Sequence, residues 1–217
     1  MTEQVLNRHY KSLAERYNDF LYYSPKFVRT LTSKMIEKLE LHNTDTLVDL
    51  GCGTGMYSLD IIKQVQLRKV IAVDPYLEML KLIPGTANIH TAISDALSFS
   101  KRPGIYDKIL IKEAVHHIPE REELFNCLFN RLRKGGILLL VHVPPEVKYP
   151  LFQKALDRCK EWHADPDELF GTTGKHRFSS RTRFHRLRSF YSEAKIFHDG
   201  KKLLYVGIII SRRTRNY

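Results

Sequence analysis

The segment 49–55 reads Asp-Leu-Gly-Cys-Gly-Thr-Gly, and these residue types can hold a ligand close to the backbone. Glycine permits positive φ and has no side chain, so the chain can turn sharply and approach a bound molecule. The spacing is G-x-G-x-G, whereas dinucleotide sites have G-x-G-x-x-G. Asp49, directly ahead of the glycines, would repel a pyrophosphate but can hold a cationic amino group. We therefore predict that Asp49, Gly51, Cys52 and Gly53 bind a ligand that carries such a group.

Two further carboxylates follow at the predicted ends of later strands. Asp74 lies 25 residues beyond Asp49, where an acidic side chain can accept both hydroxyls of a ribose. Asp95 follows the next apolar run and can accept the exocyclic amine of adenine. We expect Pro75 and Ala96, which follow these carboxylates, to line the same site. A neutral nucleoside with a cationic tail fits this order of carboxylates. The alternative is that the glycines form only a tight turn and the aspartates only cap helices.

Alternating strands and helices must position these groups. Short apolar runs that suit buried parallel strands occur at Thr46–Leu50, Lys69–Val73, Asn88–Ile93, Ile105–Ile111 and Gly136–Val143. Helical stretches lie between them at Met56–Val65, Tyr76–Ile83 and Glu120–Leu132. Near the C-terminus, two apolar runs flank Asp199-Gly200, which is a strong hairpin signal. We predict an α/β fold with a doubly wound, seven-stranded, mostly parallel sheet, an N-terminal helical cap and a C-terminal antiparallel hairpin.

With these motifs the chain resembles the class I, Rossmann-like family of S-adenosylmethionine-dependent methyltransferases, in the branch that acts largely on small molecules. The resemblance covers residues 10–143 and rests on Leu47–Gly55, Ala72–Pro75, Ser94–Ala96, Tyr106-Asp107 and His116-His117-Ile118. It implies S-adenosyl-L-methionine as cofactor. Tyrosines of the family's N-terminal helix close over the cofactor. The resemblance therefore implies that Tyr17 binds the cofactor and that Tyr10 lies beside the substrate, although both can be core residues of an amphipathic helix.

The predicted end of the fourth strand lies where a methyl acceptor must approach. The family often has histidines here, so the resemblance implies that His116 or His117 is a general base. Both can instead pack and hydrogen-bond around the methionine end of the cofactor. The family more often has small uncharged residues or Asn at the positions of Lys112 and Glu113. We predict that Lys112 binds the cofactor, and that Glu113 is a base or fixes a cationic substrate. His142 ends the fifth strand and either faces the acceptor or is satisfied by the backbone.

The net charge of +11 is concentrated near the C-terminus. Residues 1–170 hold 23 Lys and Arg against 22 Asp and Glu, whereas residues 171–217 hold 12 against 2. Arg177, Arg181 and Arg183 are predicted to bind the acceptor, because a guanidinium group matches carboxylate and phosphate geometry. Three interpretations of this basic stretch are open: a clamp for an acidic small molecule, a footprint for RNA, or a solvated face without a ligand.

We predict a single methyltransferase domain over residues 1–217. It comprises a helical cap (1–42), a cofactor-binding core (43–145), and a segment with a substrate-side helix, a basic insertion and the final hairpin (146–217). No apolar run approaches the roughly 18 residues that span a bilayer, and the His and Cys residues lack metal-site spacing. We therefore expect no membrane span, no metal and a reducing, cytoplasmic setting.

The predicted function is methyl transfer from S-adenosyl-L-methionine to O, N or S of a small molecule, with acidic molecules among the candidates. An RNA methyltransferase that uses the basic stretch is the alternative. A third interpretation is a non-catalytic scaffold that keeps the cofactor-binding fold. The intact glycine segment and the three aspartates argue against the scaffold.

Overall fold

The computed structural model describes residue 14, residues 17–18, residue 23 and residues 25–142, together with the backbone of 184–196 and 201–212. The side chains of His116, His142 and of residues 184–196 and 203–212 lie outside this description. In the described part of the chain, no helix has the length and apolar character needed to cross a membrane.

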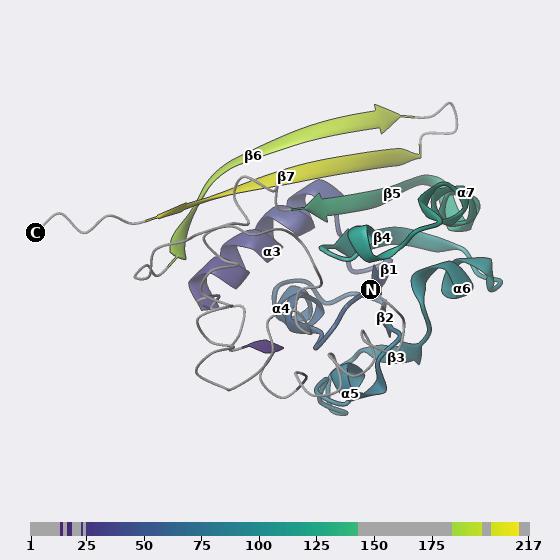
Figure 1. Cartoon of the computed structure of the whole chain (residues 1–217), viewed down its shortest axis with the longest axis horizontal. Helices are drawn as coiled ribbons and strands as arrows, with labels where there is room; N and C mark the ends of the chain where they lie inside the picture. Colours follow the sequence, from purple (N-terminus) through teal and green to yellow (C-terminus); the bar gives the residue numbers. More distant parts are fainter. Residues whose placement is uncertain are drawn as a thin grey trace, which may run out of the picture.

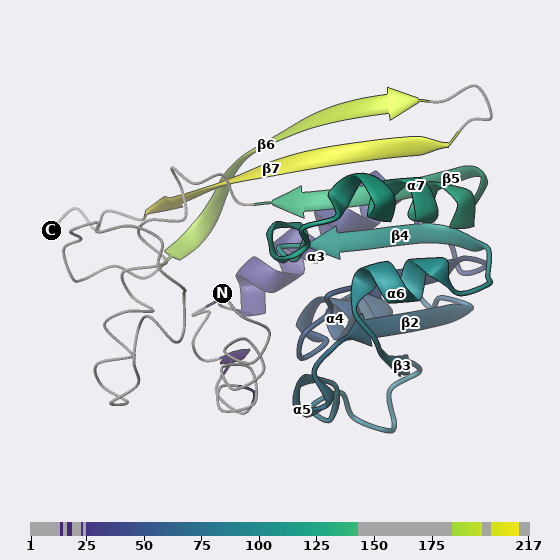
Figure 2. The ribbon, with the colours of Figure 1, turned by 45° about the vertical axis from the view of Figure 1, so that its right-hand side comes forward.

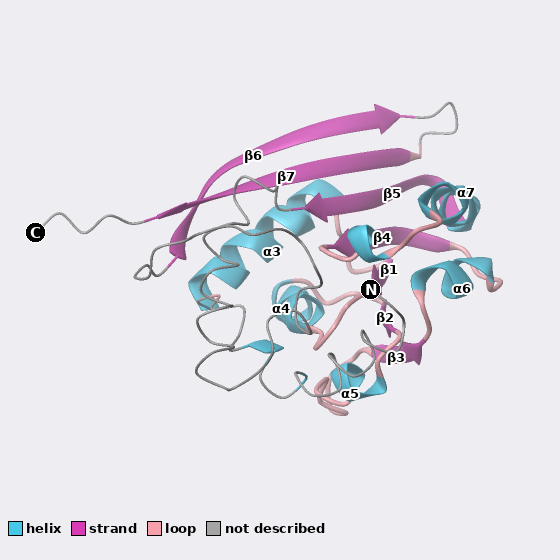
Figure 3. Ribbon diagram, in the orientation of Figure 1, coloured by secondary structure: helices cyan, strands magenta, loops and turns pink. Residues whose placement is uncertain are grey.

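Helices and strands alternate through the central part of the chain (Figures 1 and 3). The helical segments are α3 (Pro25–Leu39), α4 (Met56–Gln64), α5 (Leu77–Leu80), α6 (Ala96–Lys101), the 3-10 turn η2 (Val115–His117) and α7 (Arg121–Arg131). The strands are β1 (Thr46–Leu50), β2 (Lys69–Asp74), β3 (His90–Ile93), β4 (Tyr106–Lys112), β5 (Leu132–His142), β6 (Phe184–Ile196) and β7 (Lys202–Arg212).

The strands are arranged in the order β3-β2-β1-β4-β5-β7-β6. Each neighbouring pair among β1 to β5 is parallel. β7 pairs with β5 in parallel, and β6 pairs with β7 in the antiparallel direction. The order reverses beside β1, which is where ligands bind in open α/β sheets. The predicted α/β fold with a parallel five-stranded core is therefore confirmed. The complete seven-stranded sheet with its terminal hairpin stays a prediction.

Helices cover both faces of the parallel core (Figure 2). On one face, α3 and α4 bury Leu31, Met35 and Ile61 against Leu110 and Leu139 of the sheet. The opposite face is covered by α6 and α7 and forms a second apolar cluster. Central strands buried on both faces explain why their sequences are continuous apolar runs rather than alternating ones.

The main local differences between the predictions and the structure concern α6, α5 and β5. α6 was not predicted, because a six-residue helix is too short to show a periodic apolar stripe. α5 ends at Leu80 rather than Ile83, and Pro84 disfavours the helical conformation at the residue before it. β5 begins at Leu132 instead of Gly136, because Leu132 pairs with Tyr106 before a register shift. Gly135, with φ of 71°, lies within the extra residues of that shift.

Asp107 joins several elements at the edge where the parallel strands begin. Its carboxylate accepts the backbone N–H of Thr46 at 2.7 Å and a guanidinium N–H of Arg68 at 3.1 Å. The Nε of Arg133 lies 2.7 Å from its other oxygen. One side chain at the start of β4 therefore connects the starts of β1 and β5 and the turn before β2.

We expect Asp107→Ala to reduce the free energy of unfolding by about 1–3 kcal/mol, because the buried Thr46 N–H loses its acceptor. Asp107→Asn keeps an acceptor oxygen and should cost less. Urea denaturation of both variants measures the difference. Equal losses in the two variants would show that the charge, rather than the hydrogen bond to Thr46, is what matters.

Candidate functional site

The register of the parallel strands brings the predicted ligand-binding residues to one edge of the sheet. Leu50, the last residue of β1, lies level with Val73 of β2 and Ile111 of β4. Asp74 lies level with Ile93 at the end of β3. This carboxyl edge therefore holds the glycine turn (residues 51–55), Asp74-Pro75, Asp95-Ala96 and Lys112-Glu113.

The glycine turn requires glycine at positions where the backbone is left-handed and closely packed. Gly51 and Gly55 have φ of 73° and 71°. A Cβ on Gly51 would collide with the Cβ of Ala114, just beyond β4, and a Cβ on Gly55 would lie 2.7 Å from the Cγ1 of Ile83. The turn is thus packed on both sides, and its backbone forms part of the site.

Most of the backbone N–H groups in this turn already have acceptors within the protein. Gly51 and Cys52 both donate to the carbonyl oxygen of Val73, at 2.8 and 3.1 Å. Gly53 donates to Asp74 Oδ2 at 2.9 Å, and Gly55 donates to the carbonyl oxygen of Cys52. A phosphate-binding loop must instead offer such groups to its ligand. This arrangement therefore disfavours a pyrophosphate ligand.

Asp49 is buried beneath the glycine turn, with 2% of its surface exposed. The hydroxyl of Ser58, in the first turn of α4, donates to its Oδ2 at 2.6 Å. Burial raises the pKa of Asp49 from 3.8 to about 6, while the Ser58 hydrogen bond and the charge of Lys112 act in the opposite direction. A cationic ligand would offset the energetic cost of burying this charge, because an opposite charge favours the ionised carboxylate.

The other two predicted carboxylates also take part in hydrogen bonds with the backbone. Asp74 accepts the N–H groups of Gly53 and Tyr76 on its two oxygens, and burial raises its pKa. Asp95 is exposed and caps α6 by accepting the N–H of Ser98 at 2.7 Å. The capping role considered as an alternative is therefore real for Asp95. Each carboxylate oxygen has a second lone pair, so these bonds leave room for a ligand.

Lys112 ends β4 and is buried, with 9% of its surface exposed. Its Nζ lies 4.6 Å from the ring centroid of Tyr57 and 5.5 Å from that of Tyr23. These distances are within the range of cation–π attraction. Glu113 follows with φ of 55°, a left-handed conformation that is uncommon for residues other than glycine. Such backbone strain is found most often at functional sites.

Two described residues of the N-terminal segment contact the glycine turn. The ring of Tyr17 is the nearest group to the space above Gly53, with its Cε1 3.9 Å from where a Cβ would lie. The hydroxyl of Thr54 donates to Asn18 Oδ1 at 2.6 Å. Tyr17 and Asn18 therefore lie against the glycine turn, and the binding of the cofactor by Tyr17 stays a prediction.

The remaining predicted residues are only partly described. His117 is exposed in η2, whereas the side chains of His116 and His142 lie outside the described residues. Tyr10, Arg177, Arg181 and Arg183 also lie outside them. Cys52 is buried and burial raises the pKa of its thiol, so it stays a neutral packing group. In the described part of the chain, no group of three or more His, Cys, Asp and Glu could hold a metal ion.

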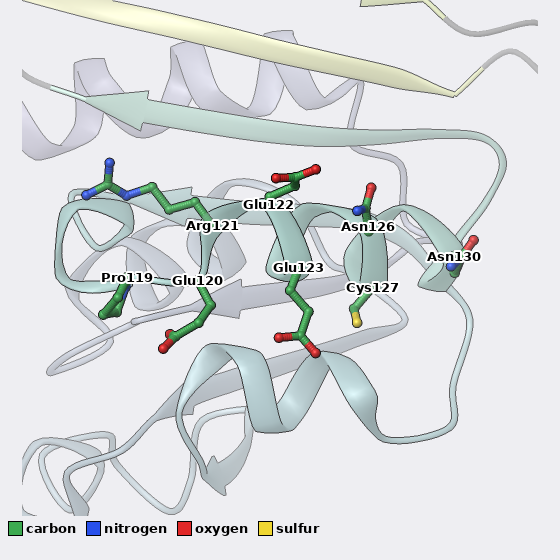
Figure 4. A pocket seen from close by; sticks show the side chains of 8 residues that line it. All are labelled: Pro119, Glu120, Arg121, Glu122, Glu123, Asn126, Cys127 and Asn130. Atoms are coloured by element: carbon green, nitrogen blue, oxygen red, sulfur yellow. The ribbon is translucent and has the colours of Figure 1, made fainter.

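A surface hollow of about 580 Å³ lies along α7 and not at the glycine turn. It is lined by Pro119, Glu120, Arg121, Glu122, Glu123, Asn126, Cys127 and Asn130. Figure 4 shows these side chains spread along one helix instead of converging on a point. Glu123 is also paired with Lys101 of α6, with 2.8 Å between Nζ and Oε1. We therefore place the candidate site at the carboxyl edge of the sheet.

The sequence predictions did not include Tyr23, Tyr57, Ser58 and Asn18. Ser58 and Tyr57 stand in the first turn of α4, directly after the glycines. That position is a signal that could have identified them, because the first turn of this helix faces the ligand. Tyr23 and Asn18 have no comparable signal, since only the packing of the N-terminal segment brings them to the site.

The buried carboxylate of Asp49 should make the stability of the protein depend on pH. Because the pKa of Asp49 is higher in the folded state than the ordinary value of 3.8, the folded protein binds more protons between about pH 4 and 6, and stability falls as the pH rises through this range. Asp49→Asn lacks this penalty. The free energy of unfolding of this variant, relative to that of the parent protein, should therefore be about 2–3 kcal/mol higher at about pH 7.5 than at about pH 4. Denaturant titrations at both pH values test this, and a difference that does not change with pH would contradict it.

The sequence matches a family described as a methyltransferase domain over residues 20–194. The protein-L-isoaspartate O-methyltransferase of Helicobacter pylori (strain J99 / ATCC 700824) is 30% identical over 114 residues, 49% of this chain and 50% of the relative. The (S)-coclaurine N-methyltransferase of Thalictrum flavum subsp. glaucum is 25% identical over 113 residues, 49% of this chain and 31% of that enzyme. The chain thus spans half or less of the length of these curated relatives.

Among solved structures, a Methanococcus maripaludis protein described as an S-adenosyl-L-methionine-dependent methyltransferase has a similar fold, with a TM-score of 0.56. It is 15% identical, and the match covers 75% of this chain and 76% of that protein. At this identity the similarity concerns the fold alone. The family match extends over most of the sequence and coincides with the parallel sheet and its glycine turn, and the chain belongs to the class I family of S-adenosylmethionine-dependent methyltransferases.

Proposed function

We propose that this protein is an S-adenosyl-L-methionine-dependent methyltransferase that acts on a small molecule at O, N or S. The observation that carries the proposal is the pair of buried carboxylates, Asp49 and Asp74, on either side of a glycine turn whose N–H groups are mostly occupied. Such a site repels phosphate and suits a ligand with a positive charge. The cofactor has two such charges, an ammonium and a sulfonium.

The residues present fit this cofactor. Asp49 would hold the ammonium of its methionine end, and Asp74 would accept the ribose hydroxyls with its free lone pairs. Asp95 would accept the adenine amine. The remaining predicted cofactor contacts are Gly51, Cys52, Gly53, Pro75, Ala96, Lys112 and Tyr17. Tyr17, which lies over Gly53, would exclude water from the cofactor.

The cofactor supplies a methyl group that is already activated for in-line displacement. The protein must therefore position the acceptor and remove its proton where needed. Glu113, at the exit of β4, is our first candidate for a base because of its strained backbone. His116, His117 and His142 are the other candidates near this edge. Tyr10, Arg177, Arg181 and Arg183 would contact the acceptor.

Two further proposals concern the whole chain and its acceptor. We propose that residues 1–217 form one domain, and that the β6–β7 hairpin completes a seven-stranded sheet beside β5. The family resemblance favours a small acceptor. The charge of residues 171–217, with 12 Lys and Arg against 2 acidic residues, specifically favours RNA as the alternative acceptor.

We expect S-adenosylhomocysteine, the product form of the cofactor, to bind with micromolar affinity in isothermal calorimetry. Asp49→Ala should abolish detectable binding and Asp74→Ala should weaken it about ten- to hundredfold, because each variant loses a charge-assisted hydrogen bond of about 1.5–3 kcal/mol. Asp107→Asn, at the opposite edge of the sheet, is the matched control and should bind normally. Tight binding of NAD together with no binding of S-adenosylhomocysteine would refute the proposed function.

The acceptor class can be identified with methyl-labelled cofactor and cell extract. We expect the label in a low-mass fraction that survives ribonuclease treatment, whereas label lost with ribonuclease would support the RNA alternative. With the acceptor in hand, Glu113→Gln should lower turnover by about 10²–10⁴ if Glu113 is the base, with cofactor affinity nearly unchanged. Normal turnover would direct the search to alanine variants of His116, His117 and His142.

A further inference from the structure

Among the residues that the structure describes, Lys112 is a buried cation without an anion at ion-pair distance. Within the described part of the chain, its ammonium has two tyrosine rings as neighbours, at 4.6 and 5.5 Å, and no hydrogen-bond acceptor or salt bridge. Aromatic faces stabilise a cation, but they do not satisfy its three N–H donors. A buried charge is normally both paired and hydrogen-bonded. The position of Lys112 therefore indicates a missing anionic partner.

The hydroxyl of Tyr57 provides a second, independent indication. It is buried and has no hydrogen-bond partner, and it is the single buried side-chain polar atom of which this is true in the described part of the chain. An unsatisfied buried hydroxyl costs about 1–3 kcal/mol, so natural structures rarely contain one. Burial, together with the negative charges of Glu113 and Asp49, raises the pKa of Tyr57 well above 10. The group is therefore protonated and available as a donor.

Lys112 and Asp49 lie on neighbouring strands and project to the same face of the sheet. Asp49 pairs in register with Leu110, two residues before Lys112, and residues two apart on a strand share a face. The charge of Lys112 also acts on Asp49 electrostatically. A cation and an anion thus lie side by side below the glycine turn, without a direct salt bridge between them in the described residues.

Glu113 is the other charged group that faces this cluster. Its negative charge acts on both Tyr57 and Tyr23. At Tyr23, the effect of Lys112 is larger than that of Glu113 and has the opposite sign. At Tyr57 the charges that act are those of Glu113 and Asp49, both negative, so an anion beside the Tyr57 hydroxyl depends on the Lys112 ammonium for its attraction.

We propose that the Lys112 ammonium and the Tyr57 hydroxyl bind the carboxylate of the cofactor's methionine end, while Asp49 binds its ammonium. This inference rests on the proposed function. The two halves of a zwitterion are then recognised by separate charges on adjacent strands, β4 and β1. Tyr23 acts as a positioning residue, since its ring centroid lies 5.5 Å from the Lys112 Nζ.

The site should accordingly select ligands that have a free α-carboxylate. S-adenosylhomocysteine has both the ammonium and the carboxylate, and its decarboxylated analogue has the ammonium alone. We expect the parent protein to bind S-adenosylhomocysteine about ten- to hundredfold more tightly than the analogue. This ratio of affinities measures the carboxylate contact directly and requires no turnover.

Lys112→Met keeps an apolar stem between the rings and removes the charge. It should lower the affinity for S-adenosylhomocysteine about ten- to hundredfold and leave the affinity for the analogue within about twofold. Tyr57→Phe removes one hydroxyl and should lower the affinity for S-adenosylhomocysteine alone by several-fold. Lys108→Met is the matched control, because Lys108 is buried on the same face of the same strand, four residues from Lys112. It should leave the ratio unchanged.

Calorimetry with both ligands on the four proteins separates the outcomes. Equal weakening of both ligands by Lys112→Met would show that Lys112 only supports the fold, and it would overturn the inference. Unchanged affinities with a raised Michaelis constant for the acceptor would assign Lys112 to the acceptor and overturn it as well. If Lys112→Met does not fold, Tyr57→Phe carries the test alone. A parent protein that binds neither ligand would refute the proposed function, whereas one that binds both equally would refute only the carboxylate site.

Discussion

The packing of Gly51 against Ala114 is the contact on which the candidate site depends. Gly51 leaves β1 with positive φ and donates its N–H to Val73 of β2, while Ala114 follows β4 on the other side. A side chain at position 51 would push the turn away from β4. It would also separate Asp49 and Asp74 from Lys112. Close approach of the chain at this one glycine therefore keeps the ends of β1, β2 and β4 close together.

The buried charges at this edge lower the stability of the protein without a ligand. Asp49 has a raised pKa because it is desolvated, and Lys112 has aromatic neighbours in place of a carboxylate. A well-packed apolar core would be more stable in this position, because desolvation of a charge costs several kcal/mol. Destabilised, oppositely charged groups in one place are typical of sites that are completed by binding.

The glycine turn also differs from the phosphate-binding turn of a dinucleotide site. In a dinucleotide site the backbone N–H groups at the helix start point to a pyrophosphate. Here the strand β2 and the side chain of Asp74 accept the N–H groups of Gly51, Cys52 and Gly53 in the turn before the helix. Most N–H groups of the turn are thus unavailable to an anion.

The sequence by itself determined the alternation of strands and helices in the parallel core, the glycine turn and its three carboxylates. These features are local: apolar runs mark buried strands, glycines mark the turn, and each aspartate stands at the end of its own strand. Short or irregular elements were less predictable, because α6 is too brief for periodicity and β5 begins before its apolar run. Only the tertiary structure brought Tyr23 and Tyr57 next to Lys112, and Tyr17 next to Gly53. Those contacts join residues far apart in the chain, and they depend on how α3 and α4 pack on the sheet, which no local pattern encodes.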